Sequence, residues 1–155
     1  MSLAIVHARA ALGVEAPRVN IEVHLSGGLP GTNIVGLPEA AVRESRDRVR
    51  SALLNANFDW PQRRITINLA PADLPKEGAR FDLAIALGIL AASGQVPIDV
   101  LDDYEFYGEL ALSGELRAIH GLLPAVIQAT RNGKAVIVPA ALADEAAQVP
   151  DARVF

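Results

Sequence analysis

The sequence predicts a mixed α/β fold, an α+β two-layer sandwich in which helices cover one face of a sheet. One observation is the alternation of apolar and polar residues over 19–25, which is typical of a strand with one buried face. Another is the stretch 81–92, which is apolar almost all round and indicates a helix buried against a sheet. Strands and helices alternate along the chain, which favours two layers around one core. At 155 residues, 51% of them hydrophobic, the chain predicts a single domain over 1–155.

In the first half of the chain, further strands are predicted over 2–8, 32–35 and 64–69, where β-branched residues are frequent. The glycines and the proline of 26–31 predict a loop. A helix is predicted to begin at Gly36-Leu37-Pro38-Glu39, because proline suits a first helical turn and a glutamate suits the positive end of the helix dipole. This helix is expected to run without a break to Asn55 or Asn57.

In the second half, two strands are predicted over 104–112 and 114–119, joined by a tight turn at Ser113-Gly114. A helix over 122–131 is expected to end at Asn132-Gly133, because glycine readily adopts the left-handed conformation of a helix cap. A strand over 135–138, a short helix over 140–147 and a strand over 153–155 complete the prediction. Because the sequence ends on the apolar residues Val154 and Phe155, with no polar tail, we expect it to be part of a longer protein.

The overall composition restricts the classes of function. There is no cysteine, so disulfides and thiolate metal sites are excluded. No targeting segment is visible, and the longest nearly apolar stretch, 83–92, falls short of the about 20 residues that span a bilayer. These features predict a cytoplasmic protein with no membrane contact. The net charge is −4, whereas a nucleic-acid binder is usually basic, so any contact with nucleic acid must come from a local patch or from several copies.

The most informative segment is 65–82, which indicates a strand, a tight loop and the start of a helix. Its Pro75-Lys76-Glu77-Gly78 step resembles the active-site loop of Lon-type serine proteases, in which the nucleophilic serine follows two residues after the glycine. Arg80 stands at that position here. Alignment through Gly121 places Leu123 where the resemblance implies the catalytic lysine.

A Ser-Lys dyad needs a hydroxyl nucleophile and a lysine that acts as a base. The segment 67–92 holds no Ser, Thr or Cys, and an arginine stays protonated and has no oxygen. The only lysines are Lys76 and Lys134. We therefore expect no catalytic residue, and hence no enzymatic activity, in this chain.

Other polar groups near the loop offer weaker alternatives. Asp73, Glu77 and Asp82 surround it, and a pair of carboxylates can perform acid-base chemistry. A salt-bridged surface loop, with Asp82 satisfying free amides at the start of its own helix, is favoured. Glu22 and His24 share the polar face of one strand, and His7 on a neighbouring strand could join them, but no metal-ligand spacing supports a metal site.

Several segments together resemble the N-terminal domain of the ComM/YifB family, which is often described as magnesium-chelatase-like. They are 1–6 with 21–26, 35–39 with 47–53, 67–78 with 81–83, and 107–110 with 114–117. The resemblance implies a fold of the Lon-protease-domain type, shared with a ribosomal-protein domain, followed in the family by an AAA+ module that uses ATP and Mg²⁺. It also implies a hexameric ring that acts in branch migration of recombining DNA. The chain itself has no Gly-x-x-x-x-Gly-Lys-Ser/Thr motif, so we expect no cofactor here.

A candidate contact surface is indicated by basic residues. Arg43, Arg46 and Arg50 follow at i, i+3 and i+7, on one face of the first predicted helix. Further basic residues that can extend this surface are Arg63, Arg64, Lys76 and Arg80. Acidic residues lie between them, and helical spacing predicts the ion pairs Glu39–Arg43 and Glu44–Arg48. A solvated face, a DNA contact and a subunit interface therefore all stay open.

The leading hypothesis is a non-catalytic accessory domain of a ring-forming, DNA-remodelling AAA+ ATPase. Its partners would be its own AAA+ module, sister subunits and, through the basic surface, DNA. Two alternatives stay open, a Lon-like peptidase or degenerate peptide-binding domain, and a subunit domain of a magnesium-chelatase-like complex.

Overall fold

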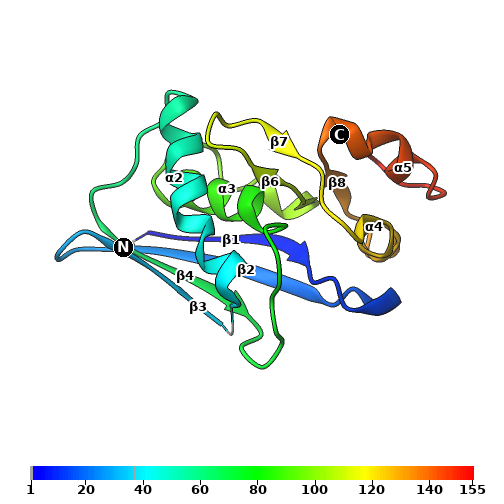
Figure 1. The fold of residues 1–155 in the computed structure, drawn as a ribbon, viewed down its shortest axis with the longest axis horizontal. Coiled ribbons are helices and arrows are strands. Elements are labelled where there is room, and N and C mark those ends of the chain that lie inside the picture. Colours follow the sequence, from blue (N-terminus) through cyan, green and yellow to red (C-terminus); the bar gives the residue numbers. More distant parts are fainter. Residues whose placement is uncertain (1, 37) are drawn as a thin grey trace.

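A six-stranded mixed sheet forms one layer of the structure, and helices form the other (Figure 1). The computed structural model describes residues 2–36 and 38–155, so Met1 and Leu37 of the family-like segments lie outside the described residues. The sheet order is β3-β4-β2-β1-β5-β8. Its strands are β1 (Ser2–Arg9), β2 (Arg18–Ser26), β3 (Gly31–Val35), β4 (Arg64–Ala70), β5 (Tyr104–Phe106) and β8 (Ala135–Ile137).

The strands alternate between a buried and an open face, as the sequence predicts. In β2, Val19, Ile21, Val23 and Leu25 are wholly buried, and the residues between them are partly exposed. β2 pairs antiparallel with β1 and β4, whereas β3 pairs parallel with β4, and β5 pairs parallel with β1 and β8. One covered face and one open face make a two-layer sandwich, which confirms the predicted fold class.

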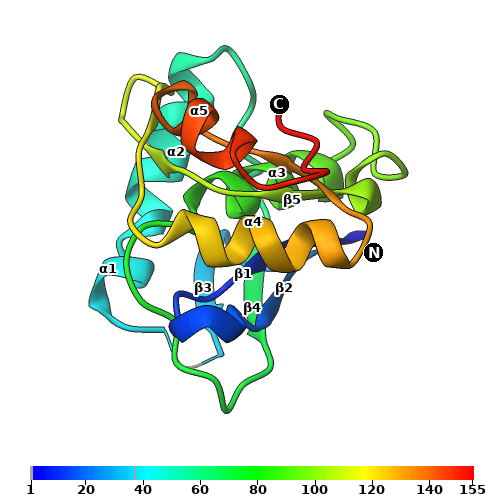
Figure 2. The ribbon, with the colours of Figure 1, turned by 90° about the vertical axis from the view of Figure 1, so that its right-hand side faces the viewer.

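The helices are α1 (Ala40–Arg43), α2 (Ser45–Asn55), α3 (Asp82–Ala92), α4 (Leu122–Arg131) and α5 (Ala143–Ala147), with single 3-10 turns at Gly13–Glu15, Leu101–Asp103 and Ala140–Leu142. α3 packs on β1 and β2, and α2 packs beside it (Figure 1). Gly88 permits the close approach of α3, because a Cβ there would lie 2.6 Å from a methyl group of Val23. Figure 2 shows α4 crossing the end of the sheet, with α5 beside it. No helix in the described part of the chain is both long and apolar enough to cross a membrane.

The predicted single helix over 39–55 is wrong, because the chain forms α1 and α2 with a break at Glu44. The cause is the guanidinium of Arg48, whose Nη2 donates a 2.8 Å hydrogen bond to the carbonyl of Ala41. A continuous helix would use that carbonyl for the amide of Ser45.

The predicted strands 104–112 and 114–119 are shorter than expected. The chain leaves the sheet after β5, and a separate antiparallel hairpin forms from β6 (Glu109–Leu110) and β7 (Leu116–Arg117). Gly108 makes this change of direction at φ +155°, where a Cβ would meet the side chain of Leu116 at 2.6 Å. The expected strand 153–155 is reduced to a single bridge between Val136 and Val154.

Candidate functional site

The loop that follows β4 is anchored by Lys76, which is fully buried. Its Nζ donates to the carbonyl of Gly36 at 2.6 Å and to the carbonyl of Pro71, and its own carbonyl accepts the amide of Glu39 at 3.1 Å. Burial lowers the pKa of the Lys76 ammonium. The expectation that Lys76 belongs to an exposed basic surface is therefore wrong, because its amine ties the loop to the end of β3.

Arg80, where the resemblance implies the Lon nucleophile, is also buried, with 4% of its surface exposed. Its Nη1 donates to the carbonyl of His120 at 3.0 Å, and its guanidinium carbon lies 5.7 Å from the centre of the Tyr107 ring. Within the described residues its Nε and Nη2 have no hydrogen-bond partner. Burial lowers the pKa of the Arg80 guanidinium. Arg80 is thus an inward-facing group, contrary to the expected exposed surface.

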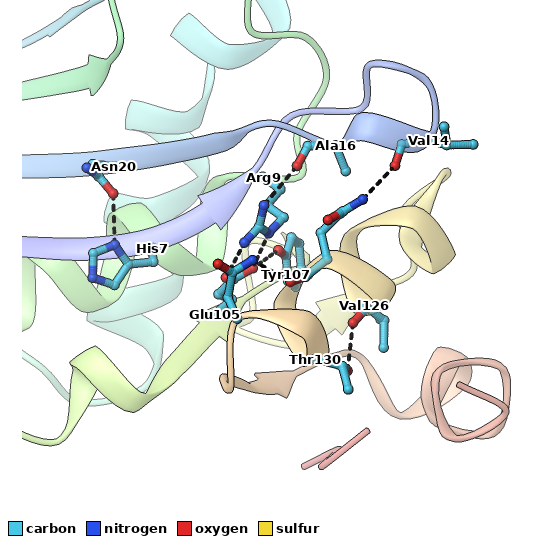
Figure 3. A network of polar contacts seen from close by, with 11 residues as sticks. His7, Arg9, Val14, Ala16, Asn20, Glu105, Tyr107, Val126 and Thr130 are labelled. Atoms are coloured by element: carbon cyan, nitrogen blue, oxygen red, sulfur yellow. Dashed lines mark hydrogen bonds and ion pairs between the residues drawn. The ribbon is translucent and has the colours of Figure 1, made fainter. Parts of the chain in front are cut away.

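The ring of Tyr107 is fixed by a buried network that Figure 3 shows in detail. Arg9 and Glu105 form a bidentate ion pair, with Nε–Oε1 at 2.9 Å and Nη2–Oε2 at 3.1 Å, and the third nitrogen of Arg9 donates to the carbonyl of Ala16. The hydroxyl of Tyr107 donates to Glu105 at 2.6 Å. Burial and the neighbouring Glu105 carboxylate raise the pKa of Tyr107 well above its usual range. The network holds β1, the turn at Ala16 and β5 together behind the Arg80 side chain.

A cavity of about 540 Å³ opens beside the loop. It is lined by Ala11, Glu39, Ala41, Arg48, Glu77, Gly78, Ala79, Arg80, Glu109, Ala118, Ile119 and His120. None of these residues carries a hydroxyl or a thiol. Leu123, at the position of the Lon lysine, lines an adjoining cavity that shares Ala118, Ile119 and His120 with this one. The lining residues therefore supply neither the nucleophile nor the amine of a Ser-Lys dyad.

Asp82, at the start of α3, joins three elements. Its fully buried carboxylate accepts hydrogen bonds from Ser45 Oγ at 2.5 Å, from Arg48 Nε at 2.7 Å and Nη2 at 3.1 Å, and from the amide of Leu110 at 3.0 Å. This bonding raises the pKa of the Arg48 guanidinium. The expected cap on the amides of its own helix is wrong, since the carboxylate serves α2 and β6 instead. The expected Glu44–Arg48 pair is likewise replaced by Arg48–Asp82, and Glu39 accepts the amide of Gly78 at 2.7 Å.

The polar residues on the open sheet face bond to one another rather than converging on a shared centre. His7 bonds Asn20 at 2.8 Å and Asp102 at 3.2 Å, and Glu22 accepts from Asn68 at 2.7 Å. Over residues 2–36 and 38–155, no group of three or more His, Asp or Glu side chains is arranged to hold a metal ion.

The structure does gather part of the predicted basic surface into one groove of about 280 Å³. Arg46 and Arg50 come from α2, and Arg63 and Trp60 come from the segment that leads into β4. The other lining residues are Pro30, Gly31, Thr32, Asp47, Pro61 and Gln62. We call this feature the arginine groove. Arg46 and Arg50 are exposed and Arg63 is half-buried, so the lining holds three arginines and one carboxylate, Asp47, which lies 3.6 Å from Arg46.

Arg43 and Arg64 are exposed but do not line the arginine groove. The break at Glu44 separates Arg43 from α2, and Arg64 projects from the open face of β4 with Thr66 and Asn68. Sequence reasoning missed Trp60. Its position three residues before Arg63, as the sole tryptophan of the chain, is the signal that could have found it.

Comparison with known proteins gives the family. The family model for ChlI, the subunit ChlI of Mg-chelatase, matches residues 21–142. The chain belongs to this family. It is 57% identical over 155 residues to the competence protein ComM of Haemophilus influenzae, and this match covers 100% of the chain and 30% of that protein. It is also 57% identical over 138 residues to the YifB protein of Escherichia coli, covering 89% of the chain and 27% of that protein.

These matches confirm the expected ComM/YifB resemblance, and the chain spans less than a third of the length of these two relatives. A more distant match is the Lon protease of Mesomycoplasma hyopneumoniae, which is 30% identical over 95 residues, 61% of the chain and 11% of that protein. The Lon similarity fits the mixed α/β fold.

Proposed function

We propose that this chain is a non-catalytic accessory domain of a longer, ring-forming AAA+ ATPase that remodels DNA. Membership of the ChlI family and similarity to a competence protein support this role. ATP and Mg²⁺ would be bound by the remainder of the parent protein, and residues 1–155 would form one domain that assembles with sister subunits. Its cytoplasmic location stays a prediction from the sequence.

The arginine groove is the observation that supports contact with nucleic acid. Arginine is suited to phosphate, because its planar fork donates two parallel hydrogen bonds and stays charged. The indole of Trp60 adds an aromatic surface beside the guanidinium groups, and stacking of a base on an aromatic ring favours single strands without selecting a sequence. Because the whole chain has a net charge of −4, attraction would be confined to this groove and multiplied by the copies in a ring.

A direct test is binding of fluorescein-labelled single-stranded and branched DNA at low salt, measured by anisotropy with this chain and with its full-length parent. The variant Arg46→Ala/Arg50→Ala removes two charges from the groove. We expect it to weaken binding about tenfold or more and to reduce the slope of log K against log [salt] by about 2. Arg43→Ala/Arg64→Ala is the matched control, because it removes the same charge outside the groove. Equal loss in both variants, or no binding by the parent ring, would contradict the DNA contact.

The peptidase alternative has some support in the Lon similarity, but none of the described residues that line the loop cavity offers a nucleophile. Incubation with casein and with a serine-reactive probe separates the two functions. We expect neither cleavage of casein nor labelling by the probe. Labelling that disappears when one serine is replaced would instead support the peptidase alternative.

A further inference from the structure

The cavity beside the loop contains a cation whose hydrogen-bonding capacity is largely unused. Arg80 lines this cavity with only 4% of its surface exposed, and its one hydrogen bond to the described residues is to the carbonyl of His120. A guanidinium carries five N–H donors, and buried donors are normally paired. Arg48, the other arginine of the cavity, already has Asp82 as its partner. Arg80 therefore stands apart, since no carboxylate pairs with it within the described residues.

We propose that this cavity binds a carboxylate group, which Arg80 holds through the free edge of its guanidinium. Nε and Nη2 form the edge that matches the two oxygens of a carboxylate in a bidentate pair. The site is distinct from the arginine groove, and the two share no lining residue.

The charge around the cavity selects the ligand class. Glu39, Glu77 and Glu109 line it together with the two arginines. A phosphate dianion would be repelled by these carboxylates about twice as strongly as a monoanion, because Coulomb energy scales with the charge. A single planar carboxylate therefore fits better than a phosphate group or a nucleic-acid backbone.

The folded protein has already removed the free edge of Arg80 from water, because Nε and Nη2 are buried. A carboxylate that pairs with this edge would form a buried ion pair, and burial makes such a pair stronger than one at the surface. The Tyr107 ring lies against the guanidinium, and Tyr107 is itself fixed by Glu105. Because Nε and Nη2 are buried in this conformation, carboxylate binding requires the terminal torsions of Arg80 to rotate until this edge faces the cavity.

A carboxylate can come from a small metabolite or from the C-terminus of a protein, and two ligands distinguish these sources. The chain, labelled with ¹⁵N, is titrated with acetate and with an acetylated tetra-alanine whose C-terminus is free, and the Nε–H resonance of Arg80 is followed. The amidated tetra-alanine and inorganic phosphate are the controls. A shift of this resonance that saturates with acetate or with the free peptide supports the proposal. At least tenfold tighter binding of the free peptide identifies a protein C-terminus, and equal binding identifies a small carboxylate.

Variants locate the binding. Arg80→Met is expected to weaken carboxylate binding at least tenfold, and Arg80→Lys, which keeps the charge but loses the bidentate fork, is expected to weaken it less. Arg64→Ala is the exposed arginine control and should bind as the wild type does. Glu77→Gln should tighten binding, because it removes a competing negative charge from the cavity.

If Arg80→Met does not fold, the Nε–H titration of the wild type and the affinity of Arg80→Lys still test whether Arg80 binds the carboxylate. No shift of the Arg80 resonance up to 100 mM acetate or peptide, or phosphate binding as tight as carboxylate binding, would overturn the proposal.

Discussion

Asp82→Asn tests whether the buried carboxylate of Asp82 holds α2, α3 and β6 together. The substitution keeps the shape of the side chain but removes the charge that three donor groups share. Breaking a buried ion pair costs about 3–5 kcal/mol, because the remaining charge is left without its partner. The Arg48 side chain is 21% exposed and can regain some water, so we expect the low end, a loss of about 3 kcal/mol. With a urea m-value of about 2 kcal/mol/M, the midpoint would fall by about 1.5 M at an unchanged slope.

A double-mutant cycle with Arg48→Met identifies the cause. If the ion pair dominates, Asp82→Asn adds little once Arg48 is gone, and the coupling energy should reach about 2 kcal/mol. Arg46→Ala/Asp82→Asn is the control, because Arg46 makes no contact with Asp82 and the effects should simply add. A loss below about 1 kcal/mol for Asp82→Asn alone, or additive effects in the Arg48 cycle, would refute this account of the fold.

Three further predictions concern the loop and the network behind it. Gly36→Ala should lower the free energy of unfolding in urea by at least about 3 kcal/mol, because Gly36 has a φ of +103° and a Cβ there would lie 2.2 Å from the carbonyl oxygen of Leu69. Gly27→Ala is the control and should have little effect, because a Cβ at Gly27 would enter open space. Because the pKa of Lys76 is lowered, the unfolded chain binds more protons than the folded chain just below pH 10.5. The free energy of unfolding of the wild type should therefore rise with pH in that window more steeply than that of Lys76→Met. Equal slopes of unfolding free energy against pH in the two proteins would contradict this. Tyr107 has a raised pKa, so the wild type should lose stability above pH 10, and Tyr107→Phe should abolish that loss while costing about 1–2 kcal/mol at pH 7.

The helices and strands were predictable where the residue pattern within one segment determines its secondary structure. β1, β2, β4, α3 and α4 lie within one or two residues of their expected bounds, because alternation or an all-round apolar surface is a property of the segment itself. The break at Glu44 was not predictable in this way, since it depends on Arg48 bonding both the carbonyl of Ala41 and the carboxylate of Asp82, 34 residues away. The early end of β5 was not predictable either, because the space around Gly108, where a Cβ would meet the side chain of Leu116, is set by the tertiary fold.

The positions of the charged residues in the loop after β4 also depend on residues that are distant in the sequence. The sequence identified Lys76 and Arg80 as basic residues of a Lon-like loop, and we expected both to extend the basic contact surface. Their burial follows from distant partners, namely the carbonyls of Gly36 and His120 and the ring of Tyr107. The arginine groove was partly predictable, because helical spacing places Arg46 and Arg50 together, but Arg63 and Trp60 join them only through the tertiary fold.

The order in which the strands are made has a consequence for synthesis on the ribosome. β1 lies in the middle of the sheet, yet its parallel neighbour β5 follows far later, and the ion pair that joins them links residues 96 positions apart. At about 5–20 residues per second, translation leaves one edge of β1 unpaired for about 5–20 s. During that interval Arg9 lacks its native partner, so the pairing of β1 with β5 must wait until Glu105 has left the exit tunnel. We expect protection of β1 from proteolysis of stalled chains to begin only after that point.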